Sequence, residues 1–163
     1  ATVLPAETST GTMQRASGII ERLFVGWDAA RLHLRLELRE PLAPYDVWLY
    51  LGGGSGAANQ RVDLDFPDPD QRPTDLLATA LLRRDAGQSG AFLYRADGHG
   101  GWAAAGPVPT AVGDKVIEMS AALTALDLAL GDELLLYLAL TQRGRALAGL
   151  PARKMARLTL RSF

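Results

Sequence analysis

The chain has 163 residues, of which 48% are hydrophobic and 21% are charged, and its formal net charge is −1. These values are typical of one globular domain with a substantial core, and without a basic excess we expect no nucleic-acid partner. The chain has no cysteine, which excludes disulfides, thiolate zinc sites and cysteine nucleophiles. No apolar run reaches the roughly 20 residues of a transmembrane helix, so we expect no membrane span.

A hairpin is predicted close to the N-terminus, after a polar segment over residues 1–17 that is either an entry segment or an edge strand. Residues Ile19–Val25 are rich in β-branched and aromatic side chains and are expected to form its first strand. Residues Arg31–Arg39 alternate charged and apolar without interruption. In a strand this places four leucines on one face and His33 with its charged neighbours on the other. The pattern therefore predicts an antiparallel strand that is buried on one face and wet on the other.

The rest of the chain is also mostly strand-like. Short segments with β-type patterns end at Gly, Pro or Asp turns, and the predicted strands are Tyr45–Leu51, Arg61–Phe66, Ala91–Arg95, Gly101–Ala104, Lys115–Ser120, Glu133–Thr141 and Arg157–Leu160. Residues Leu77–Arg84 fit either a strand or a helix. Residues Ala121–Leu130, followed by Gly131, are the best helix candidate. The run Gly52–Gly56 lacks the Lys of a phosphate-binding loop and is expected to be a flexible connection.

The element count predicts the fold class. About nine short strands with at most one short helix indicate an all-β protein with two packed sheets or one sheet closed on itself. Strands with one wet face favour the first arrangement. We therefore predict a two-sheet antiparallel β-sandwich that forms a single domain over residues 1–163.

The sequence offers little that suggests catalysis. His33 is expected on a wet strand face and His99 in a glycine-flanked turn, where solvated surface residues are the simpler interpretation. No Gly-x-Ser-x-Gly motif and no histidine pair with metal-ligand spacing occurs. We therefore predict that the domain is not an enzyme and has no catalytic residues.

Four acidic residues lie on the predicted strand Arg61–Phe66 or in the loop that follows it. Carboxylates from a strand end and its loop can hold calcium, although the spacing does not match an EF-hand. The alternative is a solvated strand face followed by an acidic loop stiffened by proline. The candidate calcium ligands, for a protein otherwise expected to need no cofactor, are Asp63, Asp65, Asp68 and Asp70.

Aromatic residues on the predicted strand Tyr45–Leu51 suggest a sugar-binding platform. Trp48 and Tyr50 share one face with Asp46, and such rings stack on the C–H face of a sugar while a carboxylate accepts its hydroxyl protons. The alternative is that both faces of this strand are covered, so that the rings belong to the core. Trp27 and Trp102 lie in predicted turns and are candidates for additional stacking.

Two groups of segments resemble a known family. The first is Gly11–Ala16 with Ile20–Asp28 and Leu32–Arg35, and the second is Val116–Met119 with Leu123–Leu128, Gly131–Leu134 and Arg145–Pro151. Together they resemble the β-sandwich accessory domains of family 57 glycoside hydrolases and glucodextranase-type enzymes, which are similar to DOMON-like domains and family 9 carbohydrate-binding modules. Residues 53–110 match poorly, and Gln14 stands where the pattern has a histidine.

The resemblance implies a non-catalytic module of a larger carbohydrate-active protein. Its expected partners are an oligo- or polysaccharide of the α-glucan type and an adjacent glycoside hydrolase domain. It carries over no individual binding residue. Two alternatives stay open, namely a structural domain that stabilises a catalytic neighbour and a DOMON-like module that binds haem or takes part in redox chemistry.

Overall fold

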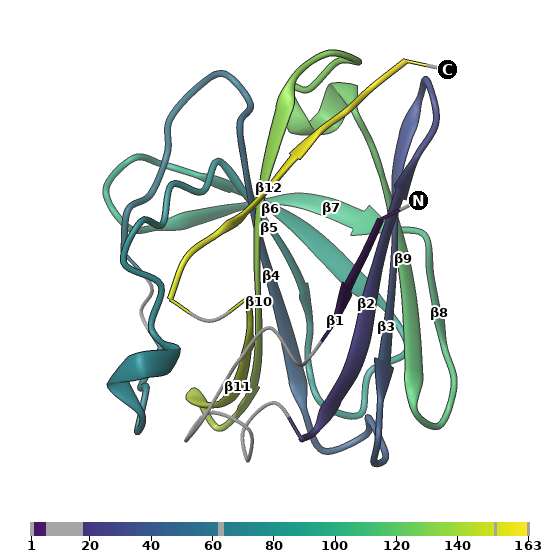
Figure 1. Ribbon diagram of the computed structural model, residues 1–163, viewed down its shortest axis with the longest axis vertical. Helices are drawn as coiled ribbons and strands as arrows, with labels where there is room; N and C mark the ends of the chain where they lie inside the picture. The colour runs from purple at the N-terminus through teal and green to yellow at the C-terminus, as the bar shows by residue number, and fades with distance from the viewer. Residues whose placement is uncertain (1, 6–17, 62–63, 152, 163) are drawn as a thin grey trace.

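The computed structural model describes residues 2–5, 18–61, 64–151 and 153–162. Over these residues the protein is all-β, with two antiparallel sheets and only short 3-10 turns as helical elements. In Figure 1 the two sheets stand side by side and pack face to face. The predicted antiparallel β-sandwich is confirmed.

The smaller sheet contains the predicted N-terminal hairpin. Its strand order is β1-β2-β3-β9-β8, with β1 Thr2–Pro5, β2 Ile20–Trp27, β3 Arg31–Leu38, β8 Thr110–Val112 and β9 Val116–Ala122. Asp28 shapes the β2–β3 turn because its Oδ1 atom accepts hydrogen bonds from the backbone N–H groups of Ala30 and Arg31, each at 2.8 Å. The turn fixes a register in which Val25, Leu34 and Met119 lie in one row across β2, β3 and β9.

The larger sheet is built around two central strands. Its order is β11-β10-β4-β5-β6-β7, and β12 pairs with the first half of β10; the bounds are β4 Asp46–Gly52, β5 Ala80–Arg84, β6 Ala91–Ala96, β7 Trp102–Val108, β10 Glu133–Gln142, β11 Arg145–Leu150 and β12 Ala156–Thr159. Residues Leu77–Arg84, left open between strand and helix, therefore contain a strand. The predicted β6–β7 hairpin around residues 97–100 is also confirmed.

The core lies between the inner faces of the two sheets. The four leucines of β3 are at most 2% exposed and belong to the same apolar cluster as the inward side chains of β4 and β10. Burying each such side chain stabilises the fold by roughly 1.5–3 kcal/mol. The alternation in β3 thus has the structural consequence predicted for it: Leu32, Leu34, Leu36 and Leu38 face the core, while Arg31, His33, Arg35 and Glu37 face outward.

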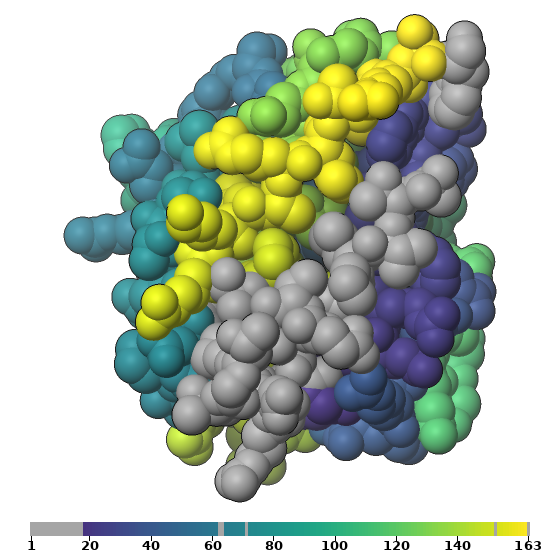
Figure 2. All heavy atoms as spheres, viewed as in Figure 1, coloured from purple at the N-terminus to yellow at the C-terminus, as the bar shows by residue number. Residues whose placement is uncertain are grey.

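The outer face of the larger sheet is not bare. A second apolar cluster lies there, where residues of the long 57–79 connection and Met155 cover side chains of β4, β5 and β10. In Figure 1 this connection lies on the side of the larger sheet away from the smaller one. Figure 2 shows the yellow C-terminal segment against the teal part of the chain, and there Met155 N–H donates to Asp75 Oδ1 at 2.9 Å.

Two predicted elements are wrong. The predicted helix Ala121–Leu130 is absent, because β9 extends to Ala122 and is followed only by a short 3-10 turn, Thr124–Leu126. Every second residue from Ile117 to Leu123 is buried, so the strand period continues into the predicted helix. The predicted strand Arg61–Phe66 has only an isolated bridge at Asp65 among its described residues, and Val62 and Asp63 lie outside them.

The glycine run Gly52–Gly56 is not a loose connection at its start. A Cβ atom on Gly52 would overlap the carbonyl oxygen of Leu77, and one on Gly53 would overlap that of Glu133. The absence of side chains therefore lets the end of β4 approach the covering 57–79 connection and β10 closely. The prediction of a flexible connection missed this packing role.

Candidate functional site

The predicted platform on β4 is only partly accessible. Val47, Leu49 and Leu51 point into the core, as predicted. Tyr50 is only 1% exposed, with its ring centroid 5.9 Å from that of Trp102 and 6.3 Å from that of Tyr137. The prediction that Tyr50 offers a stacking face is therefore contradicted, because the second apolar cluster covers it.

Trp48 keeps some exposure but is engaged within the protein. Its Nε1–H donates to Thr141 Oγ1 at 3.0 Å, and the Arg83 guanidinium lies over its ring, 4.2 Å from the centroid. Asp46 Oδ1 accepts a hydrogen bond from the backbone N–H of Ala86 at 2.7 Å. A sugar on this strand would have to displace Arg83 before it reached that face of the indole ring.

The other two tryptophans do not complete a platform with Trp48. Trp27 ends β2 in the smaller sheet, packs against the main core and donates its Nε1–H to the Arg161 carbonyl oxygen at 3.0 Å. Trp102 begins β7 in the larger sheet and packs against the second apolar cluster. The five predicted binding residues are therefore divided between two sheets.

The acidic cluster does not converge in the described part of the chain. Asp68 Oδ1 accepts a hydrogen bond from Asp70 N–H at the 3-10 turn Pro69–Gln71, and Asp70 pairs with Arg153. Asp63 lies outside the described residues. Among the residues that are described, no group of three or more His, Asp or Glu could hold a metal ion, so the calcium prediction gains no support.

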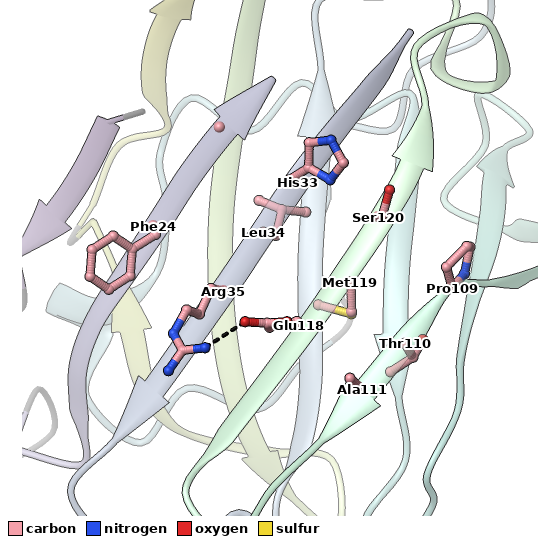
Figure 3. Close-up of a pocket in the computed structure, with 11 residues that line it drawn as sticks. Phe24, His33, Leu34, Arg35, Pro109, Thr110, Ala111, Glu118, Met119 and Ser120 are labelled. Carbon is pink, nitrogen blue, oxygen red and sulfur yellow. Dashed lines mark hydrogen bonds and ion pairs between the residues drawn. The ribbon is translucent and has the colours of Figure 1, made fainter. Parts of the chain in front are cut away.

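An accessible groove lies on the outer face of the smaller sheet. It has a volume of about 510 Å³ and crosses β2, β3, β9 and the start of β8 (Figure 3). The strand β3 contributes His33, Leu34 and Arg35 to its floor. The lining residues are Phe24, Gly26, His33, Leu34, Arg35, Pro109, Thr110, Ala111, Glu118, Met119 and Ser120.

Strand register produces the groove. Phe24, Arg35, Glu118 and Ala111 are register partners in one row across the four strands. The neighbouring row contains Gly26, His33 and Ser120, so small residues hollow the surface beside larger ones. Four adjacent strands are three spacings wide, which gives a row about 14 Å long.

A network of ion pairs runs along this surface. Arg35 donates from Nε to Glu37 Oε2 at 2.9 Å. It also donates from Nη1 to Glu118 Oε1 at 2.5 Å, and Figure 3 draws this second bond. These bonds, first to Glu37 and then to Glu118, raise the pKa of Arg35 above its ordinary value. Arg22 Nε lies 3.3 Å from Glu37 Oε1, which extends the network to β2.

A second polar group lies at the turn end of the groove. His33 Nε2 lies 3.0 Å from Asp28 Oδ2. This hydrogen bond is the largest cause of the low pKa of Asp28, about 2, and the backbone N–H groups of Ala30 and Arg31 lower it further. Arg31 Nε donates to Ser120 Oγ at 2.6 Å.

Ser120, His33 and Asp28 are the residue types of a hydrolytic triad, but their arrangement is not that of one. A triad needs the histidine to accept the serine proton. Here the serine Oγ bonds to Arg31, and the hydrogen bonds of the described residues include none between His33 and Ser120. The groove therefore offers paired donors and acceptors beside an aromatic ring, without an activated nucleophile.

Sequence reasoning missed this groove because β9 pairs with β3 from 79 to 91 positions away. The wet face of β3 was visible as alternation, but the identity of its neighbours was not. Phe24 among polar outward residues of β2, together with Gly26 in the next outward position, was the available indication.

Comparisons with known proteins add no relative: no family model matches the chain, and neither does a curated protein or a solved structure. In the described residues no helix has the length and apolar character needed to cross a bilayer.

Proposed function

We propose that this protein is a non-catalytic carbohydrate-binding module whose binding site is the groove on the smaller sheet. The observation that supports this most directly is the position of Phe24 in the same row as the Arg35–Glu118 ion pair. An aromatic ring stacks on the apolar face of a sugar. The guanidinium and carboxylate beside it donate to and accept from the hydroxyl groups around that ring.

The groove is accessible to a polymer. The Arg35 and Glu118 side chains are 44% and 52% exposed, so both reach a ligand without rearrangement of the sheet. A row about 14 Å long admits more than one sugar unit laid across the strands. The resemblance to accessory domains of glycoside hydrolases adds the expected context, which is an α-glucan-like polymer and an adjacent catalytic domain.

A structural role is the second candidate. It is favoured by the observation that the charged groups of the groove already pair with one another, so none of them needs a ligand for its charge to be balanced. In that case the domain would stabilise a catalytic neighbour and bind no sugar.

Affinity electrophoresis in gels that contain a soluble α-glucan dextrin separates these candidates. We expect the wild-type protein to be retarded and Phe24→Ala to lose most of the retardation. Phe92→Ala is the matched control, because Phe92 is 47% exposed on the outer face of the larger sheet.

Each of the other outcomes has a defined meaning. A protein that no glycan in a neutral panel retards would contradict carbohydrate binding and leave the structural role. Loss of retardation in Phe92→Ala or Trp48→Ala, with Phe24→Ala unaffected, would move the binding site to the larger sheet and contradict our assignment of the groove.

A further inference from the structure

We infer that the groove selects uncharged glycans that present adjacent free hydroxyl groups, and that it rejects glycans that carry carboxylates. This inference rests on the proposed function. It concerns which class of glycan the groove binds and which residues set that preference.

The charged side chains along the groove nearly balance one another. The ion-pair network that runs across β2, β3 and β9 contains two cations, Arg22 and Arg35, and three anions, Glu21, Glu37 and Glu118. Each arginine of this network contacts at least one carboxylate within 3.3 Å. The net charge of this network is therefore −1, which gives no long-range attraction for an anionic polymer.

A ligand carboxylate in the groove would be repelled by the carboxylates beside Arg35. The Arg35 guanidinium lies between Glu37 and Glu118, whose oxygens take its Nε and Nη1 donors. A ligand carboxylate that approached Arg35 would also approach both of these carboxylates, and like charges in close contact are unfavourable. The nearby Arg31 is held by the hydroxyl and carbonyl oxygens of Ser120, at 2.6 and 3.2 Å.

The Arg35–Glu118 pair still has hydrogen-bond donors and acceptors for a ligand. A guanidinium has five N–H donors, and the bonds to Glu37 and Glu118 leave some of them free. A carboxylate has about four acceptor positions, of which Glu118 gives one oxygen to Arg35. One hydroxyl group can therefore accept from Arg35 while its neighbour on the sugar donates to Glu118.

The Phe24 ring lies directly beside this pair. Phe24 and Arg35 are direct register partners on adjacent strands, so their Cβ atoms are about 4.5–5.5 Å apart. The Arg22 guanidinium lies over the Phe24 ring, 5.8 Å from its centroid, so a sugar that stacks on this ring takes the place of Arg22 there. It then brings the hydroxyl groups at its edge over Arg35 and Glu118. The small side chain of Ala111 ends the row on the far side of Glu118 and leaves space for the polymer to continue.

Three probes test this selection in affinity gels at low salt: a neutral dextrin, its carboxymethylated form and its O-methylated form. We expect the neutral dextrin to bind, carboxymethylation to weaken retardation by about tenfold or more, and O-methylation to abolish it. Carboxymethyl dextrin that binds as well as the neutral dextrin, or retained binding of the O-methylated form, would overturn the inference and leave the proposed function intact.

A pair of variants identifies the residue responsible. Glu118→Gln removes one carboxylate beside Arg35, so we expect weaker binding of the neutral dextrin and several-fold stronger relative binding of the carboxymethylated one. Glu133→Gln makes the same change in net charge at an exposed pair with Arg157 on the larger sheet and is expected to behave as wild type.

The control also separates the two levels of failure. Equal behaviour of Glu118→Gln and Glu133→Gln, with the neutral dextrin still bound, would contradict the role of Glu118 only. If wild type binds none of the three probes nor any glycan in the neutral panel, the proposed function itself fails.

Discussion

The outer faces of the two sheets differ in how far other parts of the chain cover them. On the larger sheet the outer face carries Trp48, Tyr50, Tyr94 and Tyr137, and it is largely covered by the 57–79 connection and Met155. On the smaller sheet the outer face carries a charged network with the Phe24 ring beside it, and a groove remains open there.

The comparison teaches that clustered aromatic residues on a strand indicate a covered face at least as readily as a binding platform. Large rings bury much apolar area, and a connection that covers them is stabilised by that burial. Paired charges have the opposite effect, because desolvating them costs more than a surface ion pair gains. The charged face of the smaller sheet therefore stays accessible.

Substitutions on the two outer faces should differ most strongly in the free energy of unfolding that they remove. We expect Tyr50→Ala to lower the free energy of unfolding by about 3–5 kcal/mol, as for other buried aromatic residues, because Tyr50 is only 1% exposed. Phe24→Ala removes a partly exposed ring from the smaller sheet and should cost less than about 1 kcal/mol. Urea unfolding monitored by circular dichroism measures both values. Equal losses in the two variants would show that the outer faces are not covered differently.

A smaller effect tests how closely the covering connection approaches. A Cβ atom on Gly52 would overlap the Leu77 carbonyl oxygen, so we expect Gly52→Ala to destabilise the fold by roughly 1–3 kcal/mol. At Gly90 a Cβ atom meets no atom within 4 Å, so Gly90→Ala is the matched control and should be close to neutral. Thermal unfolding of both variants provides the measurement. A neutral Gly52→Ala would mean that the 57–79 connection can move away from β4 at little cost.

The fold was largely predictable because its strands obey simple local rules. The alternation in β3 and the turn residues around Asp28 and residues 97–100 act within a few positions, so they identified both hairpins. The wrong helix over Ala121–Leu130 arose where short apolar spacing fits both periods and tertiary packing decides. The long 57–79 connection shows alternation only over Arg61–Phe66, and that pattern does not tell which surface the connection covers, so its position over the larger sheet was not visible in the sequence.

The candidate site was much less predictable, for a physical reason. Its central pair joins Arg35 and Glu118, which lie 83 positions apart and meet only because β9 pairs with β3. Composition and spacing report what a side chain is and which face it takes. They do not report which distant strand lies beside it or whether a connection covers it, and those two facts distinguish the buried Tyr50 ring from the partly exposed Phe24 ring.

The weakest effect that we expect concerns the pKa values of the aspartates in two hairpin turns, one from each sheet. Asp28 has a pKa of about 2, against an ordinary value of 3.8, chiefly because of the His33 side chain. The pKa of Asp97 is also lowered, chiefly by the backbone N–H groups of His99 and Gly101. In both turns the folded state favours the carboxylate, so the stability each aspartate contributes is present above pH 3.8 and is lost as the pH falls through the lowered pKa.

The two histidines therefore have different consequences when they are replaced. His33→Ala removes the main donor to Asp28, so we expect the pKa of Asp28 to rise toward its ordinary value, although the N–H groups of Ala30 and Arg31 still keep it below 3.8. His99→Ala keeps the backbone N–H that Asp97 Oδ1 accepts at 2.6 Å, so the pKa of Asp97 should remain low. Carboxyl carbon chemical shifts followed by NMR between pH 1 and 6 measure both. An unchanged pKa of Asp28 in His33→Ala would mean that the backbone N–H groups alone lower it. The carboxylate of the turn beside the groove would then be stabilised in the same way as that of the Asp97 turn in the larger sheet.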